Sequence, residues 1–255
     1  MKWNDLIEQI MLKNQGIASI NFLYEQAKNY KELPSGDWQK TLRGVLYREV
    51  NRRRFKKIGL GVYALSSYEE NKDSAYLLAL KNNSSDGYLK DVKDYHSVIE
   101  GMLIEIGNFF EYRTYTSDVN KNFDGKRLKD LCGITEIPNF TYSELKNLIS
   151  KSDVIWFNKL RLPFPKFIFE VESTTDFTKS MFKMYQLLDF DIRFVLVAKE
   201  NKKNIFLDRM DKEPFAVIKD KFNFRSFEEV AKLYFNSVEH YDLKYKFLPQ
   251  AGGHV

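Results

Sequence analysis

The sequence of 255 residues predicts an α/β protein with a small, mainly helical unit at its N-terminal end. Two runs rich in β-branched and aromatic residues, 152–157 and 165–172, are bounded by Pro, Asn or Ser and predict neighbouring buried strands. A third such run, 192–198, predicts the next strand, and a helical pattern separates it from the second. The first 65 residues instead carry three helical patterns and an alternating hairpin. The chain therefore has two parts of different design.

Composition limits the classes of protein to consider. Hydrophobic residues make up 44% of the chain and aromatic residues 15%, which is enough for a packed core. Cys132 is the only cysteine, so no internal disulfide is possible, and no Cys/His spacing predicts zinc. No apolar run reaches membrane-spanning length, and the first helical pattern is not a signal peptide. We expect a cytoplasmic protein with no membrane partner and no organic cofactor.

The N-terminal part predicts three helices and a hairpin. Apolar residues at helical spacing predict a first helix over 3–13. Ser19 is expected to cap a second helix that ends near Tyr30, and Asp37 a third that ends near Arg52. Residues 55–65 alternate as a hairpin whose glycines allow a tight turn. Residues 1–65 hold 12 Lys/Arg against 6 Asp/Glu, a net +6, while the remainder carries 28 against 29, a net −1. Such concentrated positive charge favours a polyanion partner.

Three helices followed by a basic hairpin is the order of a winged helix-turn-helix. The tract Phe55…Gly59-x-Gly61-x-Tyr63-x-Leu65 resembles the HARE-HTH family, over roughly residues 1–66. The resemblance implies binding to double-stranded DNA, with the third helix in the major groove and the hairpin on phosphates. A protein-binding winged helix with a merely solvated basic run is the alternative. The candidate DNA-binding residues are Gln39, Lys40, Arg43, Tyr47, Arg52, Arg53, Lys56 and Lys57.

A linker over 67–87 is expected to separate the domain of residues 1–66 from a second domain, 88–255, with a short helix at 75–80 inside the linker. The second domain opens with an amphipathic pattern that predicts a long helix from Leu89 to Gly107. Residues 110–116 predict a strand, 123–130 and 142–149 an insertion, and 226–235 a late helix.

Three carboxylates are predicted to gather at one edge of the sheet. Asp153 leads one strand, and Glu170 and Glu172 close the next. Residues two apart on a strand point to the same face, so Glu170 and Glu172 project together and Val171 faces the core. Carboxylate oxygens so close together suit Mg²⁺ and favour phosphodiester chemistry. Acids at strand ends that are simply solvated are the alternative.

An Asp that leads one strand, followed by an acid-x-acid at the end of the next, resembles the PD-(D/E)xK nuclease core. The likeness covers roughly residues 90–215, and Glu172 stands where the family usually has Lys. It implies a mixed sheet flanked by helices and a Mg²⁺-dependent DNA endonuclease of restriction type. Asp153, Glu170 and the Val171 carbonyl would hold the metal, with Glu172 as a further ligand or as the base that deprotonates water. Glu100, one helical turn after His96, would be an outer member, and a plain surface pair of these two is equally consistent.

Ser173-Thr174-Thr175 is expected to cap a helix from Asp176 to about Leu188. Lys179 and Lys183 share one face of this helix, and either could supply the charge of the missing motif lysine, although a solvated lysine face is equally consistent. A non-catalytic DNA-binding regulator on a decayed nuclease fold is the main alternative function. Glycoside hydrolysis by paired carboxylates is disfavoured by the basic N-terminal part. Cleavage of both DNA strands would need two sites and hence a homodimer.

Overall fold

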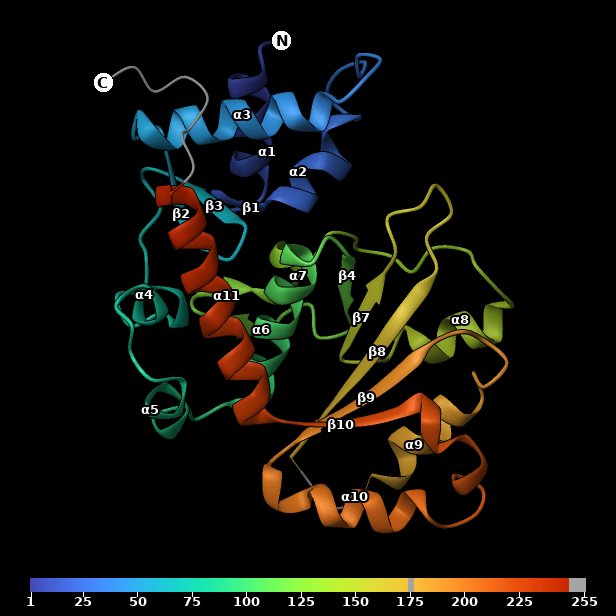
Figure 1. The fold of residues 1–255 in the computed structure, drawn as a ribbon. Coiled ribbons are helices and arrows are strands. Elements are labelled where there is room, and N and C mark those ends of the chain that lie inside the picture. Colours follow the sequence, from blue (N-terminus) through green and yellow to red (C-terminus); the bar gives the residue numbers. More distant parts are fainter. Residues whose placement is uncertain (174–176, 248–255) are drawn as a thin grey trace.

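The structure is a computed structural model that describes residues 1–173 and 177–247, without the side chains of 245 and 246. A five-stranded mixed sheet forms its centre, and a three-stranded antiparallel sheet lies in the N-terminal part (Figure 1). The predicted α/β class is confirmed.

The central sheet has the strand order β10-β9-β8-β7-β4. β8 and β9 are parallel, as are β9 and β10, whereas β7 is antiparallel to both β8 and β4. Three strands lie where the sequence predicts them, β4 begins at Arg113 instead of 110, and β10 was not predicted. The five strands are β4 (Arg113–Thr116), β7 (Val154–Phe157), β8 (Pro165–Glu172), β9 (Arg193–Ala198) and β10 (Phe222–Ser226).

Helices cover both faces of this sheet because successive strand residues point to opposite sides. Phe169 and Val171 pack in the same core cluster as α6 (Tyr95–Phe109) and α11 (Phe227–Phe247). Ile168 packs on the opposite face, in a second cluster. The helices of that face are α8 (Ser143–Ile149), α9 (Thr178–Tyr185) and α10 (Lys203–Met210).

The helix predicted from Leu89 to Gly107 is divided and shifted. Leu89 belongs to a separate short helix, α5 (Ser85–Lys90), and α6 begins after Asp94, whose carboxylate accepts from the Ser97 amide at 3.2 Å. Gly107 lies inside α6 instead of ending it. A Cβ at Gly107 would stand 2.4 Å from the Trp156 Nε1, so this glycine permits close packing of helix on sheet.

The N-terminal unit, residues 3–65, contains the three predicted helices and the hairpin. Ser19 Oγ accepts from the Phe22 amide at 3.1 Å, and Asp37 Oδ1 accepts from the Lys40 amide at 3.1 Å, which confirms both predicted caps. A short strand that was not predicted, β1, completes a sheet of order β1-β3-β2. The elements are α1 (Trp3–Lys13), β1 (Ile17–Ser19), α2 (Ile20–Ala27), α3 (Trp38–Asn51), β2 (Phe55–Gly59) and β3 (Val62–Leu65).

This unit shares a hydrophobic core with the rest of the chain. Ile58, Leu60 and Val62 belong to the same buried cluster as α6 and α11. α4 (Ala75–Leu80) and α5 also pack on α11, which runs beside α6 and reaches the N-terminal unit (Figure 1). The remaining elements are β5 (Asn122–Phe123), β6 (Lys126–Arg127), α7 (Leu128–Leu131), η1 (Glu200–Lys202) and η2 (Ala216–Lys221).

A buried polar network, the Glu105 network, joins four elements inside this core. Glu105 Oε1 lies 2.8 Å from the Lys126 Nζ, and Glu105 Oε2 accepts from the Leu60 amide and the Tyr234 hydroxyl at 2.7 Å each. Lys126 Nζ also donates to the Ile58 carbonyl at 3.2 Å. The side chains of Glu105 and Lys126 are 0% and 1% exposed. Both carboxylate oxygens of Glu105 and the Lys126 ammonium therefore have hydrogen-bond partners inside the protein.

Among the described residues, no helix combines the length and the apolar character needed to cross a membrane.

Candidate metal and phosphodiester site

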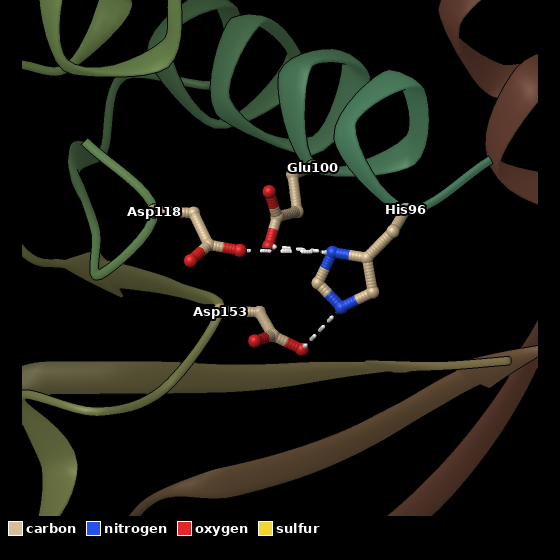
Figure 2. A group of neighbouring side chains, drawn as sticks. All are labelled: His96, Glu100, Asp118 and Asp153. Carbon is tan, nitrogen blue, oxygen red and sulfur yellow. Dashed lines mark ion pairs between the residues drawn. The ribbon is translucent and has the colours of Figure 1, made fainter. Parts of the chain in front are cut away.

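Four side chains from separate parts of the chain meet at one edge of the central sheet, and we call them the acidic cluster (Figure 2). His96 and Glu100 come from α6, Asp118 follows β4, and Asp153 precedes β7. One ligand atom of each lies within 4.8 Å of those of the others. His96 Nδ1 is 3.1 Å from Glu100 Oε1 and 3.7 Å from Asp118 Oδ2, and His96 Nε2 is 3.5 Å from Asp153 Oδ2.

Strand pairing explains why residues so distant in sequence converge. Thr116 pairs with Val154 in antiparallel register, so the segment that follows β4 lies beside the segment that precedes β7. Asp153 is tied to the end of β8 as well, because its Oδ2 accepts from the Val171 amide at 2.6 Å. His96 and Glu100 share one face of α6 because they are four residues apart. The arrangement therefore depends on the sheet and on one helix.

The electrostatics of the cluster favour a bound cation. Burial raises the pKa of Glu100 to about 8, and the charges of Asp153 and Asp118 act in the same direction. Hydrogen bonds to Asp153 and Glu100 raise the pKa of His96 to about 10. The Glu100 side chain is 0% exposed, and its Oε2 has no hydrogen-bond donor among the described residues. Three carboxylates and one imidazole with such an oxygen are a donor set that fits a divalent metal ion.

Glu170 and Glu172 lie beside the acidic cluster and face α9. Glu170 is 5% exposed and forms an ion pair with Lys183, while Glu172 Oε1 accepts from the Ser180 hydroxyl at 2.5 Å. Burial raises the pKa of Glu170 to about 7, against the effect of Lys183 and with that of the Asp153 charge. Glu170 and Glu172 project from the same face of β8, as predicted. The described ligand group of four, however, contains Asp153 and Glu100 but neither of these two glutamates.

Of the two predicted lysines, Lys183 is the one that reaches a carboxylate of the site. Its Nζ pairs with Glu170 Oε1 and donates to the Lys151 carbonyl at 3.3 Å. Lys179 is exposed. α9 begins at Thr178 and not at 176, and the predicted cap lies partly outside the described residues, which exclude Thr174, Thr175 and Asp176.

Sequence reasoning missed several polar residues of this region. Asp118 belongs to the acidic cluster, and Lys121 pairs with it while its Nζ lies 3.0 Å from His96 Nδ1. Lys202, 8% exposed, donates to the Ser173 carbonyl. Asp118 carried a usable signal, because it stands two residues after a predicted strand, much as Asp153 stands just before one.

The candidate DNA-binding residues separate into two groups. Four are exposed on or just after α3: Gln39, Lys40, Arg52 and Arg53. The other four are partly buried and contact protein groups. Lys56 donates to the Tyr68 carbonyl, and Lys57 Nζ lies 3.4 Å from the ring centroid of Tyr241.

Arg43 and Tyr47 face the interior between the N-terminal unit and α11. Arg43 Nε donates to the Tyr24 hydroxyl at 3.1 Å, and the hydroxyls of Tyr47 and Tyr241 are 2.9 Å apart. Hence the face of α3 predicted to read DNA is in part directed toward the protein.

Among the elements that build the central sheet, α6 is followed by β4, β7 and β8, then by α9 and β9, and β5, β6, α7 and α8 lie between β4 and β7. This arrangement, with acidic residues at one sheet edge, is compatible with the class of restriction-endonuclease-like proteins. A comparison with family models leads further: residues 77–248 match the model of the type II restriction enzyme NmeDI C-terminal domain. Since the match covers well over half of the chain, the protein belongs to this family. Comparison with curated proteins and with solved structures gave no significant match. Membership in the family indicates a DNA endonuclease.

Proposed function

We propose that the protein is a Mg²⁺-dependent DNA endonuclease of restriction type. The observation that carries the proposal is the acidic cluster, in which buried Glu100 and partly buried Asp153 meet at the sheet edge beside the Glu170–Lys183 pair. Three carboxylates that meet at one point repel one another, and a divalent ion would balance their charge in place of His96 and Lys121, which pair with them in this structure. Such a cluster in a member of a restriction-enzyme family supports a metal site.

The carboxylate oxygens of Glu100, Asp118 and Asp153 would hold the metal ion, and His96 would offer a ring nitrogen close to it. Glu170, which interacts electrostatically with Asp153, would be a further ligand. When bound, the ion supplies a Lewis acid for the phosphate and lowers the pKa of water. Asp153 is held in place by its hydrogen bond from the Val171 amide. The protein therefore orients this ligand in advance.

Lys183 and Glu172 have separate roles in this proposal. Lys183, held beside Glu170, places a positive charge where a phosphate would gain negative charge as it is attacked. Glu172, held by the Ser180 hydroxyl, orients the attacking water or accepts its proton. Lys183 would thus supply the positive charge of the motif lysine, whose position is occupied by Glu172 in this chain.

The N-terminal unit is proposed to be a winged helix-turn-helix that contacts double-stranded DNA. The net charge of +6 over residues 1–65 supports this role, as do the exposed side chains of Gln39, Lys40, Arg52 and Arg53. By function the chain would divide into a DNA-contacting part (1–66), a connection (67–87) and a nuclease part (88–255). A homodimer is proposed for cleavage of both strands.

Incubation of plasmid DNA with the protein and Mg²⁺, with and without a chelator, tests the proposal. Asp153→Asn and Glu100→Gln should each lower the cleavage rate by at least about 100-fold, because each removes an anionic ligand. Calorimetry should show weaker binding of Mg²⁺ or Mn²⁺ to both variants. Asp220→Asn, which changes an exposed carboxylate elsewhere, serves as the control. Undiminished cleavage by Asp153→Asn would contradict the metal assignment.

A non-catalytic DNA-binding regulator is the second candidate, and the observation that favours it is Glu172 in the place of the motif lysine. In the same assay this candidate predicts a shift of DNA in a native gel without cleavage in either metal. Cleavage that disappears in Asp153→Asn would exclude it.

A further inference from the structure

A cavity of about 490 Å³ lies where the N-terminal unit meets α6 and α11. Asn108 and Phe109, which line it, are at the C-terminal end of α6, while the acidic cluster uses His96 and Glu100 at the other end. With a rise of 1.5 Å per residue, these two ends are separated by about 18 Å. The cavity is therefore distinct from the proposed catalytic site.

Tyrosine rings make up much of the cavity wall. Tyr24 and Tyr47 come from α2 and α3, Tyr63 from β3, and Tyr241 from α11. The hydroxyl of Tyr241 lies 2.9 Å from that of Tyr47 and 3.5 Å from that of Tyr63. Burial raises the pKa of Tyr47 and of Tyr63, so both hydroxyls stay protonated and can donate. Tyr24 and Tyr63 are buried, whereas Tyr47 and Tyr241 are partly exposed and provide the aromatic surface and hydroxyl groups that a ligand could reach.

The lining is also rich in positive charge. Arg43, Lys159 and Lys244 line the cavity together with a single acid, Glu111. Arg43 is partly buried and uses its Nε on the Tyr24 hydroxyl, and no carboxylate of the described residues lies within ion-pair distance of its guanidinium. A partly desolvated, unpaired guanidinium is well suited to bind a phosphate through two parallel hydrogen bonds.

We propose that this cavity binds one nucleotide, with its phosphate on Arg43 and Lys244 and its base against the tyrosine rings. The volume lies within the range of small-molecule sites, and stacking of a base on an aromatic ring is tolerant of base identity. The nucleotide comes either from solution or from a DNA duplex, out of which one nucleotide is rotated. Binding of a free nucleotide from solution is independent of the proposed function. Binding of a nucleotide rotated out of a duplex rests on the proposed binding of DNA.

Calorimetric titration of the full chain with each of the four deoxynucleoside monophosphates tests the site itself. Saturable binding is expected, and Arg43→Gln and Lys244→Gln should each weaken it by about tenfold, because each removes one charged phosphate contact. Arg209→Gln, which neutralises an exposed arginine on α10, should leave the affinity unchanged. Ribose 5-phosphate should bind at least about tenfold more weakly, because it has no base to stack. Thermal melting reports whether each variant is folded, and Lys244→Gln, on an exposed residue, remains informative if Arg43→Gln is not.

Duplex oligonucleotides that contain 2-aminopurine distinguish the two sources. A rise in 2-aminopurine fluorescence on binding that is reduced in Lys244→Gln identifies a nucleotide rotated out of DNA. Binding of monophosphates with no such rise identifies a free nucleotide. The proposal is overturned if neither probe gives a signal, or if ribose 5-phosphate binds as tightly as the monophosphates. Because none of these measurements uses cleavage, failure of the nucleotide site is distinguishable from failure of the endonuclease proposal.

Discussion

Lys179 and Lys183 lie about one turn apart on α9, but their surroundings differ. Lys183 pairs with Glu170, and Lys179 is exposed. We therefore expect Lys183→Ala to lower the single-turnover cleavage rate by about 100-fold, because it removes the partly buried positive charge proposed to lie beside the phosphate. Lys179→Ala should stay within about twofold of the parent, since a solvated charge contributes little. Equal losses in the two variants would show that α9 acts only through its overall charge.

Lys57 should make stability depend on pH. Burial lowers its pKa to about 7 from 10.5, against the charge of Glu105. Below about pH 7 both folded and unfolded chains carry the proton, and the cost of the buried charge is complete. From about pH 7 to 10 only the unfolded chain retains it, so the free energy of unfolding rises by up to about 1.4 kcal/mol per pH unit.

Lys57→Met lacks this titration and keeps most of the packing against Tyr241. The stability of the parent relative to Lys57→Met, measured by urea unfolding, should increase by about 2 kcal/mol between about pH 7 and 9. A difference that stays constant over this range would mean that Lys57 remains protonated in the folded protein.

The directions of side chains on regular strands were predictable from the sequence. The contacts of side chains brought together by pairing of distant segments were not. The positions of Glu170 and Glu172 on one strand face follow from alternation alone. The place of Asp118 just after a predicted strand was visible in the sequence, but Asp118 joins Asp153 only because β4 pairs with β7 in one register, which no local pattern encodes. For the same reason the inward direction of Arg43 was not foreseen, since its neighbour α11 is almost 200 residues away in sequence.

Helix α6 carries Glu105, the centre of the Glu105 network. Among substitutions on α6, we expect those in this network to lower the free energy of unfolding most. Glu105→Gln removes the negative partner of buried Lys126 and should lower the free energy of unfolding by about 3–5 kcal/mol. Glu69→Gln, at an exposed glutamate, should change it by less than about 0.5 kcal/mol. Urea unfolding followed by circular dichroism gives both values. A loss below about 1 kcal/mol for Glu105→Gln would show that the Lys126 ammonium does not depend on the carboxylate, for example because water reaches and solvates it in the variant.

Helix existence was predictable from periodicity, whereas helix ends depended on tertiary packing. α1 and α3 begin where the sequence indicates: apolar spacing alone predicts the start of α1, and for α3 the capping residue Asp37 agrees with the spacing. Gly107 was interpreted as a stop signal, yet it lies inside α6, because Trp156 approaches the helix too closely for a Cβ. α11 extends to Phe247 instead of 235, and its later turns include Tyr241, which contacts the N-terminal unit.

For the whole molecule, DNA affinity should depend on salt mainly through the N-terminal unit. Neutralising the exposed pair Arg52 and Arg53 to Gln should reduce the slope of log affinity against log salt by about 1–2, because fewer counterions are released. The control is Lys81→Gln with Lys90→Gln, two exposed lysines outside this unit. Fluorescence anisotropy at several salt concentrations provides the slopes. Equal slopes for parent and Arg52/Arg53 variant would place the DNA on another surface.

The shared core of the N-terminal unit and the nuclease part determines how the chain responds to a protease. Ile58, Leu60 and Val62 are buried against α6 and α11, and the Leu60 amide donates to Glu105. A cut in the exposed stretch around Ser66 and Ser67 would therefore leave two fragments that remain associated and co-migrate on a native gel. Amide hydrogens of β3 and of the middle of α6 should exchange with solvent at similar slow rates, because exposing either requires opening of the same cooperative unit.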